Sequence, residues 1–89
     1  MMQVAGWHVE VEFDEDDTHT RAAALLRLRD GTELRAHGRS QRNPHDPAEP
    51  RIGEEISGAR ALADLAEQLL RKAETEIEEV THQPAHLTG

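Results

Sequence analysis

The chain has 89 residues with a formal net charge of −8, no cysteine, one Trp and one Phe. A single domain of this length buries only about 60 to 65% of the surface of its unfolded chain, so we expect a thin core and association with a second copy or another protein. The lack of cysteine excludes disulfides and thiolate metal sites, and the acidic charge argues against general affinity for phosphate backbones or anionic membranes.

Residues 7–13 alternate strictly between apolar and polar side chains, which predicts a half-buried strand. The acidic stretch that follows, 14–19, is too polar to be buried and lacks the glycine and glutamate spacing of a calcium loop. We therefore interpret it as a solvated turn rather than a cation site.

Residues 20–29 and 32–39 are predicted as the second and third strands of an antiparallel sheet. A two-residue loop between them would place charged side chains on the core face. A three-residue loop, 29–31, with Gly31 in the left-handed conformation, avoids this conflict. It pairs apolar residues on the inner face, namely Leu26 with Leu34 and Ala24 with Ala36.

The outer face of this sheet is the candidate interaction surface. From Arg21 to Arg42 the chain has six arginines and two acidic residues, a local balance of +4 in an acidic protein. One interpretation is a surface for an anion or RNA. The other is that cross-strand pairs with Glu10, Glu12 and Glu33 neutralise it, or that its apolar residues seat a partner sheet. The candidate residues are Arg21, Ala23, Leu25, Arg27, Arg35, His37 and Arg39.

A proline-rich loop, 41–50, precedes the main helix. Residues 53–73 carry apolar side chains at steps of three and four, which predicts one amphipathic helix with its apolar stripe on the sheet. Gly53 is the predicted N-cap, and a close approach to the sheet would explain Gly58 in the helix interior. The stripe consists of Ile56, Ala59, Leu62, Ala63, Leu65, Ala66, Leu69, Leu70 and Ala73.

The apolar spacing continues beyond this helix, but one helix over 53–80 would be about 40 Å long, whereas a strand of seven or eight residues spans about 25 Å. A capping-box pattern begins at Thr75 and favours a break. The sequence therefore predicts a short second helix over 75–81.

Together these elements predict an α+β fold, a three-stranded antiparallel sheet with both helices on one face. Pro84 ends regular structure, so we expect a single domain over 1–84 and a polar C-terminal tail over 85–89. Because no signal peptide and no apolar run approaching about 18 residues is present, we expect a cytoplasmic location without membrane contact.

The sequence offers no set of residues for catalysis. Ser40 and Ser57 lie outside a nucleophile-elbow pattern, and no glycine-rich phosphate loop occurs. His82 and His86 are separated by Pro84, which prevents a shared helical face for a metal ion. We therefore expect no enzyme activity, no cofactor and no metal site.

Several short segments, spread over nearly the whole chain, are specific as a set. They are Thr20-Arg21-Ala22 with Ala24, Gly38, Asn43-Pro44 with Asp46, Ile52-Gly53-Glu54-Glu55, Ala59-Arg60-Ala61-Leu62 with Asp64-Leu65, and the ending Ile77-Glu78 to Val80-Thr81-His82-Gln83-Pro84. In these segments the chain resembles a family of short acidic actinobacterial proteins, grouped as a domain of unknown function, whose fold is classed as double-stranded-RNA-binding-domain-like (dsRBD-like). It departs from the family pattern at Ala36 and over 39–42.

This resemblance implies a sheet with helices on one face, homodimerisation, and a link to stress and dormancy; the overall shape is similar to that of ribosome hibernation promoting factors. We therefore expect a homodimeric interaction module that docks on the ribosome or a ribosomal protein. The alternatives are direct RNA binding through the Arg-rich outer face and a protein–protein regulator unrelated to ribosomes. Duplex RNA binding is disfavoured, because Glu54 and Glu55 stand at the start of the predicted helix, where they would repel phosphates.

Overall fold

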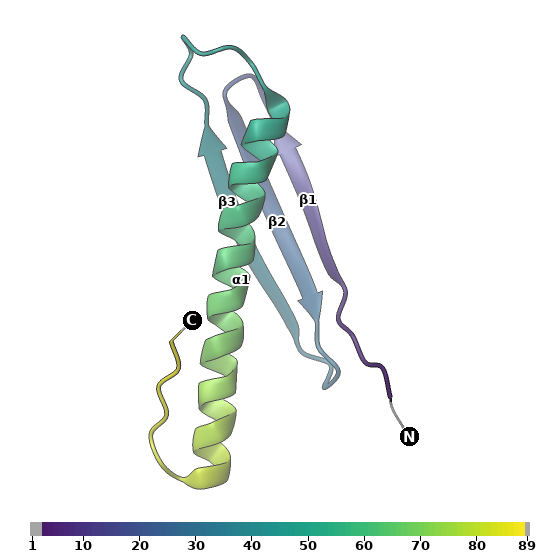
Figure 1. Cartoon of the computed structure of the whole chain (residues 1–89), viewed down its shortest axis with the longest axis vertical. Coiled ribbons are helices and arrows are strands. Elements are labelled where there is room, and N and C mark those ends of the chain that lie inside the picture. The colour runs from purple at the N-terminus through teal and green to yellow at the C-terminus, as the bar shows by residue number, and fades with distance from the viewer. Residues whose placement is uncertain (1–2, 89) are drawn as a thin grey trace.

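A computed structural model describes residues 3–88 as one antiparallel sheet with a single long helix on one of its faces (Figure 1). The strands are β1 (Val9–Glu15), β2 (His19–Arg27) and β3 (Glu33–Gln41), and the helix is α1 (Pro50–Thr81). The strands lie in the sheet in chain order, β1-β2-β3. The predicted α+β architecture and the placement of helix on one face of the sheet are confirmed.

The hairpin between β2 and β3 has the predicted register. The inner face pairs Leu26 with Leu34 and Ala24 with Ala36. The Leu28 amide donates to the Thr32 carbonyl at 2.8 Å, which leaves a three-residue loop between these two residues. Gly31 ends that loop with φ of +91°, a conformation that side chains rarely adopt. The alternation of apolar and charged residues therefore predicted the three-residue loop correctly.

The core is thin and consists mostly of alanine. Within residues 3–88 the buried apolar side chains are Ala22, Ala24, Leu26, Ala36, Ala61 and Leu65. Such small side chains permit α1 to lie very close to the sheet. The closest approach is at Gly38 of β3, where a Cβ atom would lie 2.3 Å from the Ser57 carbonyl oxygen and 2.4 Å from the Ala61 amide nitrogen.

The predicted helix boundaries are wrong. The helix begins at Pro50, with Glu49 as the N-cap residue, because proline is well suited to the first helical position. Gly53 therefore lies inside the helix, where a Cβ would lie 2.6 Å from the Thr20 hydroxyl oxygen. The glycine at this position allows the first turn to approach β2, and does not cap the helix.

The predicted break before residues 75–81 is also wrong, because α1 continues without interruption to Thr81. The Thr75 hydroxyl donates to the Arg71 carbonyl at 3.1 Å, one turn back, and so caps no new helix. Lys72 pairs with Glu76 across the predicted break and also with Asp30 in the β2–β3 loop at 2.8 Å. The helix therefore overhangs the sheet, and the molecule extends over 54 × 33 × 20 Å.

The apolar stripe of α1 does not lie on the sheet as predicted. Of the nine stripe residues only Leu65 is buried, and the other buried helix residues are Ser57, Gly58 and Ala61. Small residues at these positions face Gly38 and Ala36 and let the helix backbone contact the strands. Leu69 also packs against the core, whereas Ile56, Ala59, Leu62, Ala63 and Ala66 remain exposed among the described residues.

Candidate interaction surfaces

The outer face of the sheet carries all seven predicted candidate residues, and their charges are sorted by strand. The register aligns Asp14 with Arg21 and Arg39 in one cross-strand row. In the next two rows, Glu12 aligns with Ala23 and His37, and Glu10 aligns with Leu25 and Arg35. The face is thus acidic along β1, partly apolar along the middle of β2, and basic along β3.

Glu33 neutralises part of the basic side of this face. It accepts a hydrogen bond from Arg27 at 2.6 Å and a longer one from Arg35 at 3.4 Å. The hydrogen bond from Arg27 and the two positive charges hold the pKa of Glu33 below its usual range. No such ion pair within residues 3–88 involves the side chains of Arg21 or Arg39, which lie opposite each other. Of the predicted neutralising residues, Glu33 alone is thus seen in an ion pair there.

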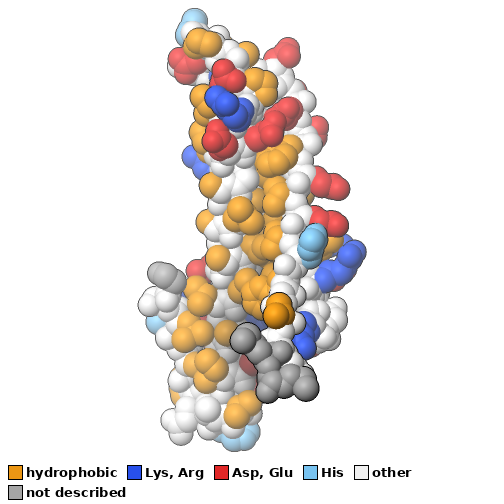
Figure 2. Space-filling model, turned by 45° about the vertical axis from the view of Figure 1, so that its right-hand side comes forward, with side chains coloured by type: hydrophobic (Ala, Val, Ile, Leu, Met, Phe, Trp, Pro, Cys, Tyr) orange, Lys and Arg blue, Asp and Glu red, His pale blue; other side chains and the backbone are white. Residues whose placement is uncertain are grey.

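A second surface, which the sequence did not indicate, lies on the other side of the molecule and is apolar. We call it the apolar face. It combines the inner row of the β1 side with the uncovered stripe of α1 and forms a band along the long axis (Figure 2). Its large members and their exposed fractions are Trp7 (58%), Val9 (40%), Phe13 (41%), Ile56 (39%) and Leu62 (45%). Exposed Ala59, Ala63 and Ala66 continue it along the helix.

One feature of the sequence does point to the apolar face. The predicted helix stripe has nine apolar residues, whereas the inner face of the predicted sheet offers mainly small Ala and Gly residues and a few Leu residues to cover them. The helix contacts β2 and β3 much more than β1, so Val9 and Phe13 in the inner row of β1 stay partly exposed (Figure 1). Large contiguous apolar patches on a surface mark interaction sites.

A hollow lies at the end of the sheet where the 41–50 loop meets the acidic turn. Arg42 lines this hollow, and its guanidinium donates hydrogen bonds to the carbonyl oxygens of Asp17 at 3.0 Å and Asp46 at 2.6 Å. The neighbouring Glu54 carboxyl group raises the pKa of Glu15. Within residues 3–88 no group of three or more histidine, aspartate or glutamate side chains is arranged to hold a metal ion.

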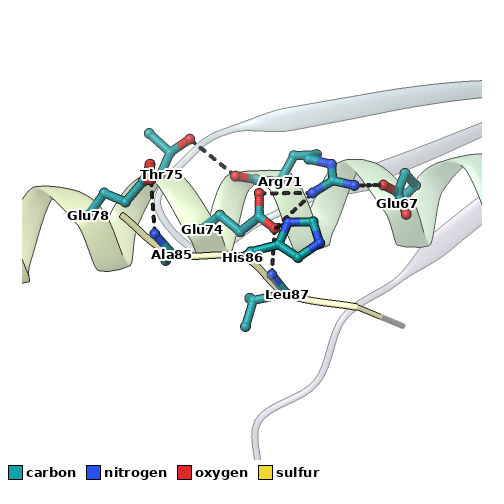
Figure 3. Close-up of polar contacts among 8 residues, drawn as sticks. All are labelled: Glu67, Arg71, Glu74, Thr75, Glu78, Ala85, His86 and Leu87. Carbon is teal, nitrogen blue, oxygen red and sulfur yellow. Dashed lines mark hydrogen bonds and ion pairs between the residues drawn. The ribbon is translucent and has the colours of Figure 1, made fainter. Parts of the chain in front are cut away.

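The C-terminal segment folds back along α1 and is tied to it through Glu74 (Figure 3). The Leu87 amide donates to the Glu74 carboxylate at 2.6 Å, and the Ala85 amide donates to Glu78 at 3.1 Å. Arg71 pairs with Glu74 at 2.7 Å, and the His86 ring lies 3.6 Å from the same carboxylate. The Leu87 amide and the Arg71 guanidinium lower the pKa of Glu74.

This arrangement predicts that acid releases the C-terminal segment. Because the folded pKa of Glu74 is lowered, the contact is complete above the ordinary carboxyl pKa of 4.5 and is lost as the pH falls through the lowered value. In NMR spectra recorded from pH 7 to pH 2, the Leu87 amide resonance should shift with a midpoint below 4.5. Glu74→Gln should abolish that shift. A Leu87 amide that is indifferent to pH would contradict the contact.

None of the described helices is long and apolar enough to cross a membrane. The comparisons with known proteins agree with the fold. A family model described as Rv2632c-like matches residues 5–86. MT1780, an uncharacterised protein of Mycobacterium tuberculosis (strain CDC 1551 / Oshkosh), is 47% identical over 81 residues, which cover 91% of this chain and 85% of that protein.

Rv2632c of Mycobacterium tuberculosis (strain ATCC 25618 / H37Rv), also uncharacterised, is 40% identical over 76 residues, covering 85% of this chain and 81% of the relative. The crystal structure of Rv2632c superposes with a TM-score of 0.83 at 36% identity, covering 93% of this chain and 98% of that chain. The predicted membership of a family of actinobacterial proteins of unknown function is therefore confirmed. The chain belongs to the Rv2632c-like family.

Proposed function

We propose that this chain is a non-enzymatic interaction module that works as a homodimer, and that the apolar face is where the second copy binds. The observation that carries the proposal is the uncovered stripe of α1. The exposed stripe positions from Ala59 to Ala66 are alanine or leucine, and five large apolar side chains of the face are 39 to 58% exposed. A helix packs its apolar stripe against a partner, and here the sheet covers Leu65 and Leu69 but leaves the other side of the stripe exposed.

The exposed area supports the same conclusion. The chain has an accessible surface of 7038 Å². Compact monomers of its mass, 10.0 kDa, expose about 5,200 Å², so the excess is about 1,800 Å². A standard protein–protein interface removes about 800 Å² from each partner. Burying the apolar face would thus bring the exposed area closer to that of a compact protein, with part of the excess remaining on the overhanging end of α1.

A second copy of the chain suits this face for a geometric reason. Ala59, Ala63 and Ala66 lie at steps of four and three, so two helices can approach closely through their small side chains. In a twofold arrangement Leu62 and Ile56 of each copy fill the space beside these alanines. Homodimer interfaces are more apolar than transient ones, which matches a face without charged side chains at its centre.

Light scattering and sedimentation velocity at tens of micromolar test the dimer. We expect the wild type to have twice the mass of the chain and Leu62→Asp to be monomeric with an unchanged circular dichroism spectrum. Thr75→Asp, which adds the same charge to an exposed helix position outside the face, is the matched control and should remain dimeric. A wild type that is monomeric at these concentrations would remove the proposal.

Docking on the ribosome is a second candidate, in keeping with the resemblance to hibernation factors and a role in stress or dormancy. The specific observation is the opposed pair Arg21 and Arg39 on the outer face, which no ion pair among residues 3–88 neutralises. Two guanidinium groups side by side can bind a phosphate or a carboxylate of the ribosome. The acidic β1 edge beside them disfavours broad contact with RNA.

Co-sedimentation with ribosomes from the same cells, at low and at moderate salt, tests this second candidate. We expect binding at moderate salt that is lost when Arg21 and Arg39 are both replaced by alanine. The double replacement of Arg27 and Arg35 is the matched control, because Glu33 already engages these side chains. Absence of the folded wild type from every ribosomal fraction would reject ribosome docking while leaving the dimer untouched.

A further inference from the structure

The two edges of the sheet are built differently. Three side chains of α1, spaced four residues apart, bind the outward peptide groups of β3. The Arg60 guanidinium donates to the Arg39 carbonyl at 2.8 Å, the His37 amide faces the Asp64 carboxylate at 3.4 Å, and the Gln68 amide donates to the Arg35 carbonyl at 2.8 Å. This edge is therefore closed to another strand. Covering an edge in this way prevents unwanted pairing.

The edge at β1 has no such cover. The Asp16 amide donates to the His19 carbonyl at 2.9 Å, and bonding alternates along an antiparallel pair. By that alternation Val9, Val11 and Phe13 direct their peptide groups away from β2. Within residues 3–88, β2 is the only strand beside β1. The side chains of the described residues that bind a strand edge bind β3, and none donates to or accepts from the outward groups of β1. An open strand edge is a template for a further strand.

The side chains of β1 restrict which strand fits. Its outer row contains Glu10, Glu12 and Asp14, all exposed and in no ion pair among the described residues. If a second copy of β1 paired here in antiparallel fashion about Val11, Glu10 of each copy would lie opposite Glu12 of the other, and like charges directly opposite destabilise a sheet. The acidic row therefore disfavours a second copy and favours a strand with basic side chains on the same face.

The inner row of β1 sets a second requirement for the added strand, namely apolar side chains on its inner face. Val9 and Phe13 are each about two-fifths exposed because α1 lies over β2 and β3. A strand added beside β1 would place every second side chain alongside them, and apolar side chains there would reduce their exposure. The adjoining strand lies in the plane of the sheet, whereas the proposed dimer partner lies above the same two side chains.

We propose that the open edge of β1 binds an extended segment of a partner protein as a fourth strand, and that this segment alternates apolar and basic residues. Main-chain hydrogen bonds to the outward groups of Val9, Val11 and Phe13 supply the affinity. The acidic outer row and the apolar inner row of β1 supply the selection. This edge borders the apolar face proposed for the homodimer and shares the side chains of Val9 and Phe13 with it.

Synthetic octapeptides test this proposal on the full chain. The probe alternates Lys and Val, a second peptide alternates Glu and Val, and a third has the Lys and Val composition without alternation. Binding is followed by the fluorescence of Trp7, the single Trp of the chain, and by amide chemical shifts. We expect the alternating Lys peptide to bind at least about tenfold more tightly than either control, with the largest shifts at 9–15.

Two variants locate the site. Val11→Pro removes one outward amide without affecting the bonds to β2, and should weaken binding about tenfold relative to Val11→Ala, which loses the side chain but retains the amide. The double replacement Glu10→Lys with Glu12→Lys should reverse the preference toward the Glu peptide, and it remains informative if the proline variant unfolds. Equal binding of all three peptides, no binding at millimolar peptide, or shifts confined to β3 would overturn the proposal.

Discussion

Replacement of Gly38 by alanine is expected to destabilise the protein by about 3 kcal/mol or more, because overpacking against atoms that cannot move is costly. The new Cβ would lie 2.3 Å from the Ser57 carbonyl oxygen and 2.4 Å from the Ala61 amide nitrogen. Both are backbone atoms of α1, so relief requires the whole helix to move off β3. That movement would expose Ala36 and Ala61, which are fully buried. Urea unfolding followed by circular dichroism measures the loss.

Gly58→Ala is the matched control for this substitution. Gly58 is a buried glycine of α1 on the side of Phe13, where a Cβ would meet the ring at 3.5 Å, an ordinary contact distance. Alanine should therefore stabilise the helix by about 1 kcal/mol through its higher helix propensity. The two substitutions add the same methyl group with opposite expected signs. A tolerated Gly38→Ala would mean that the helix lies farther from β3 than described here.

These two glycines also show what the sequence could predict. The predicted inner face of the third strand, with Leu34 and Ala36, extends by alternation to Gly38, and the structure places Gly38 in that row. The reason for a glycine at this place is a contact with a helix about 20 residues later, and no local pattern encodes that contact. For Gly58 the predicted close approach is present in a weaker form, while the tightest approach is on the strand side of the interface.

The apolar stripe of α1 illustrates a second limit. A period of three and four residues reports which side of a helix avoids water, but it does not report which surface covers that side. Here Ser57, Ala61 and Leu65 of the helix are buried against the sheet. The small residues Ser57 and Ala61 allow the closest approach of the two backbones. Neither Ser57 nor Ala61 belonged to the predicted stripe. Larger residues of the stripe, such as Leu62, remain exposed.

The sequence predicted which residues share the outer face, but not which of its arginines form ion pairs. Strict alternation with the correct loop length determined that Arg21, Arg35 and their neighbours share one face, and the register confirms it. Which arginines are free depended on side-chain geometry. Glu33 engages Arg27 and Arg35, whereas Glu10 and Glu12 lie on the far strand and make no ion pair among the described residues.

Leu26→Ala is expected to cost about 3 kcal/mol, within the range for truncation of a buried leucine. Leu26 is 1% exposed and is one of the two largest fully buried side chains, in a core that otherwise contains mainly alanine. Alanine neighbours cannot extend into the space that it leaves, so the cavity remains open. A domain of this length has a free energy of unfolding of about 5 to 13 kcal/mol, and this loss is a large share of it.

Leu25→Ala provides the comparison, because it makes the same truncation one residue earlier and on the opposite face of the same strand. Leu25 is half-buried on the outer face between Glu10 and Arg35, so its loss should cost about 1 kcal/mol or less. Both variants should be measured in the Leu62→Asp background, since formation of the proposed dimer would add to the apparent stability and would depend on protein concentration. Similar losses at the two positions would mean that the outer face is itself covered in solution, whereas a loss confined to Leu26 places the single-chain core on the helix side of the sheet.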